Sequence, residues 1–291
     1  MKRNRKCGLL AAILVGTLML VGCGDSGSGT SNNGKNKSAT KILPSYPKID
    51  QLDWHVDSGI VDEQRRVLMD YTNNSKYTIV EFDLTFTQKS DVTDEQRQEE
   101  LDKVKESFSF SDDDLSEVKD KPLSGYVNSV ILTRPGDTST KQGCFYYGGI
   151  YYMKDMSFYD LLTPDIATIK YIDNDTVHTV SYDFKSKNYT EDTDTTPAKE
   201  TSKNSLTTDV PMITSDYVEV DDYDTSVYIT SYGIVSTEYE KYCKELEQVG
   251  YELNDEYFNT KRYVNVSAQK QVELTYDSDK QSVQCVIEQA Q

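Results

Sequence analysis

Hydrophobic and polar residues alternate in short runs along most of this chain. The clearest run extends from Tyr77 to Lys89, where Val80, Phe82, Leu84 and Phe86 occupy every second position. A period of two predicts a strand with one buried face. The same pattern predicts further strands over 67–71, 125–133, 144–153, 168–172 and 176–184, and the last two should form a hairpin around residues 173–175.

Other segments have the period of a helix. Thr93 and Gln96 have the spacing of a capping box, which predicts a charged helix with a narrow apolar stripe at Leu101, Val104 and Phe108. A second short helix is predicted over 111–119 and a helical turn over 157–162. A longer helix from Thr237 should end at Gly250. Its apolar face would comprise Tyr239, Tyr242, Cys243, Leu246 and Val249.

The order of these elements predicts two domains. Short strands separated by turns, without alternating long helices, favour a β-sandwich over residues 46–188, with the helices of 93–119 as an insertion. Residues 189–216 are almost entirely polar and predict a linker. A strand signal at 227–229, the long helix and strand patterns at 257–264, 271–276 and 282–288 predict a small α+β domain over 217–291. The fold class is therefore mainly β, or α+β.

The start of the chain is different. Four basic residues lie within the first six, and an uncharged apolar run follows as far as Gly22. This pattern is typical of a secretory signal peptide. The run is slightly shorter than the roughly 20 residues that a membrane-spanning helix needs. Residues 24–41 are rich in Ser, Gly and Asn, so they predict a flexible tether that spans on the order of 25 Å.

Leu20-Val21-Gly22-Cys23 resembles the lipobox of bacterial lipoproteins. The resemblance implies that the Cys23 thiol receives a diacylglyceryl group, a palmitate-type lipid anchor, and that signal peptidase cuts between Gly22 and Cys23. Two acyl chains give stable anchoring, since each buried methylene adds about 0.8 kcal/mol. The implied organisation is a signal peptide over 1–22 and a lipidated cysteine with its tether over 23–45. The implied location is the extracytoplasmic face of the cell membrane.

Two weaker resemblances concern the rest of the chain. The strand pattern of 46–188 is similar to the immunoglobulin-like modules of secreted Gram-positive lipoproteins. The stretches EYEKYCKELEQVGYELN and VELTYDSDKQSVQCVIEQ resemble a domain of unknown function at the C-termini of Firmicute lipoproteins. That family has no established chemistry to transfer.

Charge excludes one class of partner. The formal net charge is −18, and removal of residues 1–22, which carry four basic and no acidic residues, would make it −22. Nucleic acid is a poor partner for such a chain, because its affinity depends on Lys and Arg neutralising phosphates. An anionic membrane surface would also repel the protein, so the lipid must do the anchoring.

Candidate catalytic chemistry is sparse. The chain has two histidines, His55 and His178, and Cys144 is the one thiol that either could activate. No nucleophile elbow, P-loop or dinucleotide motif occurs, and no Cys/His spacing suits zinc. Acidic runs at 112–114, 173–175 and 219–224 offer oxygen ligands to calcium but lack EF-hand spacing. We therefore expect no catalytic residues, metal or cofactor, although paired carboxylates could hydrolyse glycosides if they faced each other.

Two groups of side chains remain as candidates. The stretch 145–152 is strongly aromatic, and tyrosines present both a stacking face and a polar tip. A binding patch is predicted at Tyr146, Tyr147, Tyr151 and Tyr152. Cys243 and Cys285 could form a disulfide across a loop of about 40 residues, or remain two buried free thiols.

These observations predict a membrane-anchored surface lipoprotein that acts as a non-catalytic binding or interaction module of the cell envelope. Its partner would be an unidentified protein or glycan. One alternative is a surface hydrolase that acts on glycan or peptide. Another is a solute-binding lipoprotein, which the small number of predicted helices disfavours.

Overall fold

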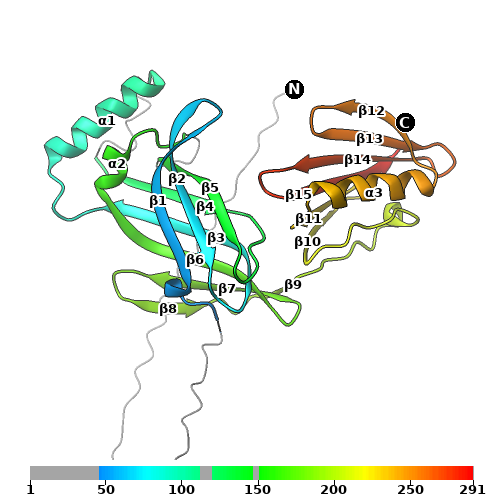
Figure 1. The fold of residues 1–291 in the computed structure, drawn as a ribbon, viewed down its shortest axis with the longest axis horizontal. Coiled ribbons are helices and arrows are strands. Elements are labelled where there is room, and N and C mark those ends of the chain that lie inside the picture. The colour runs from blue at the N-terminus through cyan, green and yellow to red at the C-terminus, as the bar shows by residue number, and fades with distance from the viewer. Residues whose placement is uncertain (1–45, 112–119, 147–150, 291) are drawn as a thin grey trace, which may run out of the picture. The chain divides into compact units, whose positions relative to one another are not determined.

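The computed structural model describes residues 46–111, 120–146 and 151–290. Across these residues the protein is mainly β, with two antiparallel sheets and few helices (Figure 1). Each sheet has a hydrophobic core of its own, and residues 44–291 form one compact unit. The prediction of a mainly β fold, consistent with a β-sandwich, is therefore confirmed.

The first sheet has the strand order β1-β2-β5-β4-β3-β6-β7-β8, and β9 also pairs with β7. Its strands are β1 (Leu52–Val61), β2 (Gln64–Asn73), β3 (Thr78–Gln88), β4 (Ser124–Ser129), β5 (Thr138–Tyr146), β6 (Leu162–Asp173), β7 (Thr176–Asp183), β8 (Asn188–Glu191) and β9 (Thr196–Pro197). Two-residue turns join β1 to β2 and β6 to β7. Asp62, Glu63, Asn174 and Asp175 in these turns all have positive φ, as a type I′ turn requires. The hairpin predicted around residues 173–175 is confirmed.

β5 changes its partner along its length. Its residues up to Gly143 pair with β2, whereas Cys144 to Tyr146 pair with β4. Lys141, next to this change, has a φ of 60°. The strand thereby connects the β1-β2 layer to the layer that contains β3, β4 and β6.

The two ends of this sheet also approach each other. The rings of Trp54 in β1 and Phe184 after β7 have centroids 6.4 Å apart. The backbone N–H of Ile49, just before β1, donates to the hydroxyl of Tyr189 in β8 at 2.8 Å. The sheet therefore curls around the first core (Figure 1).

Alternation in β3 predicts its buried face correctly except at one residue. Phe82, Leu84 and Phe86 lie in the first core, but Val80 does not. A register shift against β6 marks a β-bulge beside Ile79. A bulge adds one residue to one strand, so Ile79 stays in the first core while Val80 turns to the opposite face of the sheet.

Two helices belong to the first part of the chain. α1 (Asp94–Phe108) lies between β3 and β4 in the sequence, and α2 (Met156–Asp160) precedes β6. The predicted capping box is confirmed: the Gln96 N–H donates to Thr93 Oγ1 at 3.2 Å, and the Thr93 N–H donates to Gln96 Oε1 at 2.9 Å. Leu101 and Val104 pack on the first core. The short helix predicted over 111–119 falls almost wholly outside the described residues.

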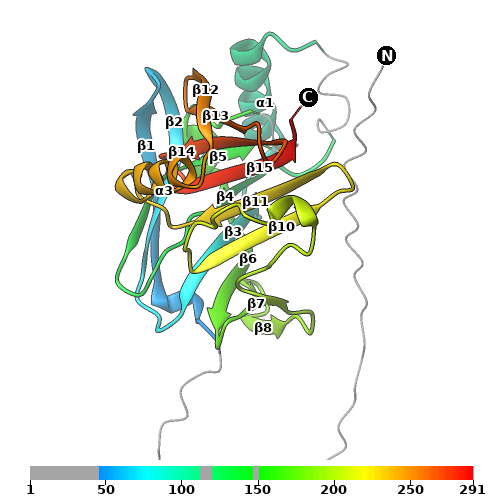
Figure 2. The same cartoon turned by 90° about the vertical axis from the view of Figure 1, so that its right-hand side faces the viewer.

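The second sheet has six strands in the order β10-β11-β15-β14-β13-β12. They are β10 (Tyr217–Asp222), β11 (Ser226–Tyr232), β12 (Glu252–Tyr257), β13 (Thr260–Asn265), β14 (Lys270–Asp277) and β15 (Ser282–Gln289). α3 (Ser236–Gln248) packs on one face of this sheet (Figure 2). The three predicted closing strands are present, but β10 and β12 were not predicted.

α3 differs from its prediction at its start and in the extent of its buried face. It begins at Ser236, and Glu238 accepts a hydrogen bond from the Val235 N–H at 3.0 Å, so the predicted cap at Thr237 is wrong. Gly250, with a φ of 93°, ends the helix as predicted. Val249 is 48% exposed and does not share the buried face of the helix.

The segment predicted to be a polar linker, 189–216, is structured. It contains most of β8, all of β9 and a 3₁₀ helix at Ser205–Thr207. Leu206 and Val210 are buried in the second core. The linker prediction is therefore wrong, because a few apolar side chains hold an otherwise polar segment against the sheet.

A third apolar cluster joins the two sheets. Its buried residues come from both sheets, from the β4–β5 connection and from the segment between the sheets: Val80, Leu132, Val177, Ala198, Tyr217 and Tyr232. The bulge in β3 makes this contact possible, because it turns Val80 outward. Arg134 Nη2 also lies 2.9 Å from the Asp216 carboxylate, which adds an exposed ion pair between the sheets.

Candidate functional site

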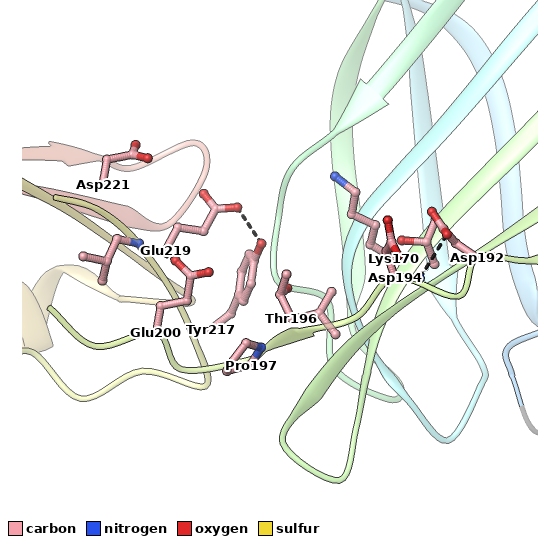
Figure 3. Close-up of a pocket in the computed structure, with 12 residues that line it drawn as sticks. Lys170, Asp192, Asp194, Thr196, Pro197, Glu200, Tyr217, Glu219 and Asp221 are labelled. Atoms are coloured by element: carbon pink, nitrogen blue, oxygen red, sulfur yellow. Dashed lines mark hydrogen bonds between the residues drawn. The ribbon is translucent and has the colours of Figure 1, made fainter. Parts of the chain in front are cut away.

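A cavity of about 500 Å³ adjoins the third cluster, where the first sheet meets β10 (Figure 3). Lys170 comes from β6, Asp192 and Asp194 follow β8, and Tyr217 and Glu219 belong to β10. The remaining lining residues are Val177, Thr179, Thr196, Pro197, Glu200, Val220 and Asp221. Five carboxylates and one ammonium group therefore face this space, which makes it strongly acidic.

Several of these carboxylates already bond to the protein itself. Asp192 Oδ1 accepts from the Asp194 N–H at 3.1 Å, and Glu200 Oε2 accepts from the Val220 N–H at 2.8 Å. Glu219 accepts from the hydroxyls of Tyr217 and Tyr232, at 2.5 and 2.7 Å. In the described part of the chain, no group of three His, Cys, Asp or Glu side chains is arranged to hold a metal ion.

Tyr217 and Tyr232 form the wall between the cavity and the third cluster. Their rings stack with centroids 5.0 Å apart. Burial raises the pKa of both hydroxyls well above the ordinary value, and the hydrogen bonds to Glu219 raise it further. Both phenols therefore stay protonated and act as donors to Glu219 at any physiological pH.

A second set of charges lies on the outer face of the first sheet, next to the cavity. Asn128 donates to Glu81 Oε1 at 2.8 Å and also to Asp83, and Lys170 donates to Glu81. Burial, with the nearby Glu81 charge, raises the pKa of the Asp83 carboxyl to about 7, although the Asn128 hydrogen bond opposes the shift. This group can therefore change its protonation near neutral pH.

The predicted tyrosine patch does not form one exposed surface. Tyr146 is 8% exposed and belongs to the first core. Tyr151 packs beside that core against Phe108 and Phe110, with ring centroids 4.7 and 4.8 Å away. Tyr147 lies outside the described residues.

Tyr152 belongs to a stack on the opposite face of the sheet. Phe145 and Tyr152 form an antiparallel bridge, so the chain reverses within the stretch that was predicted to be one strand. The ring of Phe145 lies 5.2 Å from Tyr126 and 4.4 Å from Tyr152, and the Arg66 guanidinium lies 4.1 Å from the Tyr152 ring. Because these planar groups stack face to face, mainly their edges remain accessible to a ligand.

The three described cysteines are free and buried. Burial raises the pKa of Cys144 and of Cys285 to about 12. Burial also raises the pKa of Cys243. Cys285 contacts the hydroxyl of Tyr242 at 3.9 Å, rather than a disulfide partner. These thiols therefore lack the depressed pKa of a nucleophilic cysteine.

Neither histidine has the surroundings of a catalytic base for these thiols. His55 Nε2 lies 3.9 Å from the Asp70 carboxylate on an exposed surface. The His178 ring stacks on Tyr171 with centroids 5.5 Å apart. The candidate pairs of Cys144 with His55 or His178 are therefore not formed.

An exposed surface that sequence patterns missed lies on β12. All six residues of this strand are exposed. Leu253 is 46%, Tyr257 69% and Phe258 85% exposed, and Tyr257 and Phe258 contact each other at the turn into β13. A fully exposed strand has no alternation of apolar and polar residues, which is the pattern that predicts strands. Only the adjacent aromatic residues Tyr257 and Phe258 could have indicated this surface in the sequence.

Comparison of the chain with protein-family models, with curated proteins and with solved structures found no match. Among the described residues, no helix is both long and apolar enough to cross a bilayer. Gly22 and Cys23, the predicted cleavage and lipidation residues, lie outside the described residues.

Proposed function

We propose that this protein is a lipid-anchored lipoprotein of the extracytoplasmic membrane face and serves as a non-catalytic binding or interaction module. The anchoring part of the proposal is supported by the sequence Leu20-Val21-Gly22-Cys23, by the basic and apolar segment before it and by the polar tether after it. The proposed immunoglobulin-like character of the first sheet rests on its strand pattern alone.

The hairpin of β12 and β13 carries the binding part of the proposal. Tyr257 and Phe258 project from its turn with 69% and 85% of their surfaces exposed. Adjacent exposed aromatic side chains are costly to leave in water and are enriched at protein interfaces. We call residues 252–258 the β12 edge and expect it to contact the partner.

Replacement of the lipid acceptor tests the anchoring. Cys23→Ala should abolish incorporation of a radiolabelled fatty acid and leave the chain unprocessed or released to the medium. The measurement is fractionation of cells, with an immunoblot of membrane and medium. A variant that is still cut and membrane-bound like the wild type would contradict this part of the proposal.

Replacement of the exposed aromatics tests the binding. The double variant Tyr257→Ser/Phe258→Ser should lose partners that crosslink to the wild-type protein on intact cells, because the contact area is removed. Tyr223→Ser is the matched control, since Tyr223 is 56% exposed and follows β10 at the other edge of the same sheet. An unchanged set of crosslinked partners in the double variant would argue against binding through this edge.

One observation favours the alternative of a surface hydrolase. Asp83 and Glu81 share the Asn128 amide, and the pKa of Asp83, about 7, suits a general acid. Two observations argue against a catalytic role. Asn128 and Lys170 already donate hydrogen bonds to these carboxylates, and neither carboxylate lines the cavity. Release of sugars or peptides from cell-wall material, abolished by Asp83→Asn in an otherwise stable protein, would favour the hydrolase over the binding module.

A further inference from the structure

The two edges of the second sheet are not equivalent. Along β10, the Val218 N–H donates to the Ala198 carbonyl at 2.9 Å, and the Glu200 N–H donates to the Val218 carbonyl at 3.1 Å. The Glu200 side chain also accepts from the Val220 N–H. This edge is thereby covered by the chain itself. Among the described residues, the backbone of β12 forms no hydrogen bond outside its pairing with β13.

The pairing of β12 shows which of its backbone groups point outward. Tyr257 pairs with Thr260 across a two-residue turn, and Glu256 pairs with Lys261. In a two-residue hairpin the pair that flanks the turn is hydrogen-bonded and the next pair is not. The N–H and C=O of Glu256 therefore point away from β13. A register shift between Leu253 and Asp255 separates the three pairs next to the turn from the pairs of Glu252 and Leu253 with β13.

The turn itself has an unusual backbone. Phe258 has a φ of 51°, a conformation that bulky side chains rarely adopt. Strained residues of this kind concentrate at ligand-binding sites. Here the left-handed residue is also the most exposed large hydrophobic side chain among the described residues. A recognition surface is expected to contain such a residue, which is aromatic, exposed and strained, at the end of a strand with an unpaired edge.

The charge of the β12 edge selects the chemistry of its partner. Glu252, Asp255 and Glu256 lie within six residues, and no basic residue lies on the same strand. Lys261 sits 4.0 Å from Glu256 but also 3.1 Å from Glu240, so it is shared. Charged edge strands discourage pairing with neutral or like-charged strands. They leave pairing open to a strand of opposite charge.

We propose that the β12 edge binds an extended, basic peptide segment of a partner protein as a seventh strand of the sheet. Main-chain hydrogen bonds to Glu256 hold the segment. Its Lys or Arg side chains meet Glu256 on one face of the strand, and its apolar side chains rest on Tyr257 on the other face. This inference rests on the proposed binding function, and it adds the chemical class of the partner.

Charge argues against the two other occupants of such an edge. A second copy pairing through β12 would place three carboxylates opposite three others, and directly opposed like charges destabilise a sheet. Insertion of the Phe258 turn into a bilayer would bring the same carboxylates to an anionic surface, which repels them.

The experiment uses the full chain in detergent and three fluorescent decapeptides. One peptide alternates Lys and Val, a second alternates Glu and Val, and the third is the Lys-Val peptide with an N-methyl group on every backbone amide. N-methylation keeps the charge but removes the N–H groups needed for strand pairing. Fluorescence anisotropy should show binding of the Lys-Val peptide, with affinity at least tenfold lower for the other two.

Charge reversal locates the binding site. Asp255→Lys/Glu256→Lys should weaken binding of the Lys-Val peptide at least tenfold. Asp53→Lys/Glu63→Lys is the matched control, because it places the same charges on the exposed β1-β2 hairpin of the first sheet, and it should change the affinity less than threefold. Circular dichroism of each variant confirms that the sheet is intact, and Tyr257→Ser/Phe258→Ser provides a second variant without charge change.

Any of the following results would overturn the inference. Equal binding of the N-methylated peptide would mean charge attraction without strand pairing. Dimers in sedimentation that disappear with Asp255→Lys/Glu256→Lys would identify a second copy as the occupant, and binding of Tyr257 and Phe258 to phosphatidylglycerol vesicles would identify the membrane. If no peptide binds while Tyr257→Ser/Phe258→Ser still loses its cell-surface partner, the peptide inference fails and the proposed function stands. If neither effect occurs, both fail.

Discussion

Asn73 organises one end of the first sheet. Its side chain is fully buried, and its amide nitrogen donates to the carbonyls of Tyr77 and Thr133 at 2.8 Å each. Its side-chain oxygen accepts from the N–H and hydroxyl of Ser75. A single side chain therefore joins the end of β2, the turn before β3 and the segment after β4. Asparagine suits this role because it carries donors and an acceptor in one compact group.

Asn73→Ala should lower the free energy of unfolding by about 3 kcal/mol, because two buried carbonyls lose their donors at about 1–3 kcal/mol each. Urea denaturation followed by tryptophan fluorescence of Trp54 measures the change. Asn74→Ala, at an exposed neighbouring position, is the control and should change stability by less than about 0.5 kcal/mol. Similar losses in the two variants would show that the buried hydrogen bonds contribute little.

Among the secondary-structure elements, α1 is predicted by a local sequence signal, the capping box, and the structure contains it. Thr93 and Gln96 form their reciprocal hydrogen bonds, and α1 starts at Asp94 as the sequence predicts. Thr93→Ala should destabilise the helix by about 1 kcal/mol, because it leaves an N–H at the helix start without an acceptor. Thr93→Ser keeps the hydroxyl and should be close to neutral.

Hydrogen exchange of the α1 amides, compared with that of the β3 amides, measures this effect directly. Faster exchange limited to α1 in Thr93→Ala is the expected result. Unchanged exchange in both variants would mean that packing of Leu101 and Val104 alone holds the helix.

The accuracy of prediction differs between elements for physical reasons. β3 and α3 are predicted because one face of each is buried, and burial imposes a period on the sequence. β12 has no buried face and therefore no period. The segment containing Leu206 and Val210 is packed by contacts with distant strands, which a polar local composition does not reveal.

The carboxylate cluster could not be predicted from local patterns either. Asn128 reaches Glu81 across 47 residues of sequence, and Lys170 reaches it across 89. Only the pairing of β3 with β4 and β6 brings these residues together. By contrast, the tyrosine stretch is visible in the sequence, but the reversal of the chain within it divides its members between the core and the outer stack.

For the whole molecule, the Asp83 cluster predicts a pH dependence of stability. The folded protein keeps the Asp83 proton up to about pH 7, whereas the ordinary pKa of the group is 3.8. Between these values the folded state binds more protons than the unfolded state, so stability should fall as the pH rises through this window. The loss should be complete once the pH exceeds the folded pKa.

Asp83→Asn should remove this slope and make the protein more stable than the wild type above pH 7, since the amide oxygen can still accept from Asn128 without a charge beside Glu81. Thermal unfolding measured from pH 4 to pH 8 provides the test. Asp53→Asn, at an exposed carboxyl, should leave the slope in place. A wild-type protein whose stability rises steadily over this range would contradict the assignment.

The strand order of the second sheet also has a consequence for the order in which the sheet is completed. β15 follows both of its partners in the sequence, and it pairs with β11 on one side and β14 on the other. Until residues 282–289 leave the ribosome, β11 and β14 have no common neighbour, and the core beneath α3 stays open to solvent. Chains interrupted earlier would expose that core and be available to proteases, because unpaired strands and apolar surface mark incomplete folding. The second core therefore closes only after β15 has been synthesised.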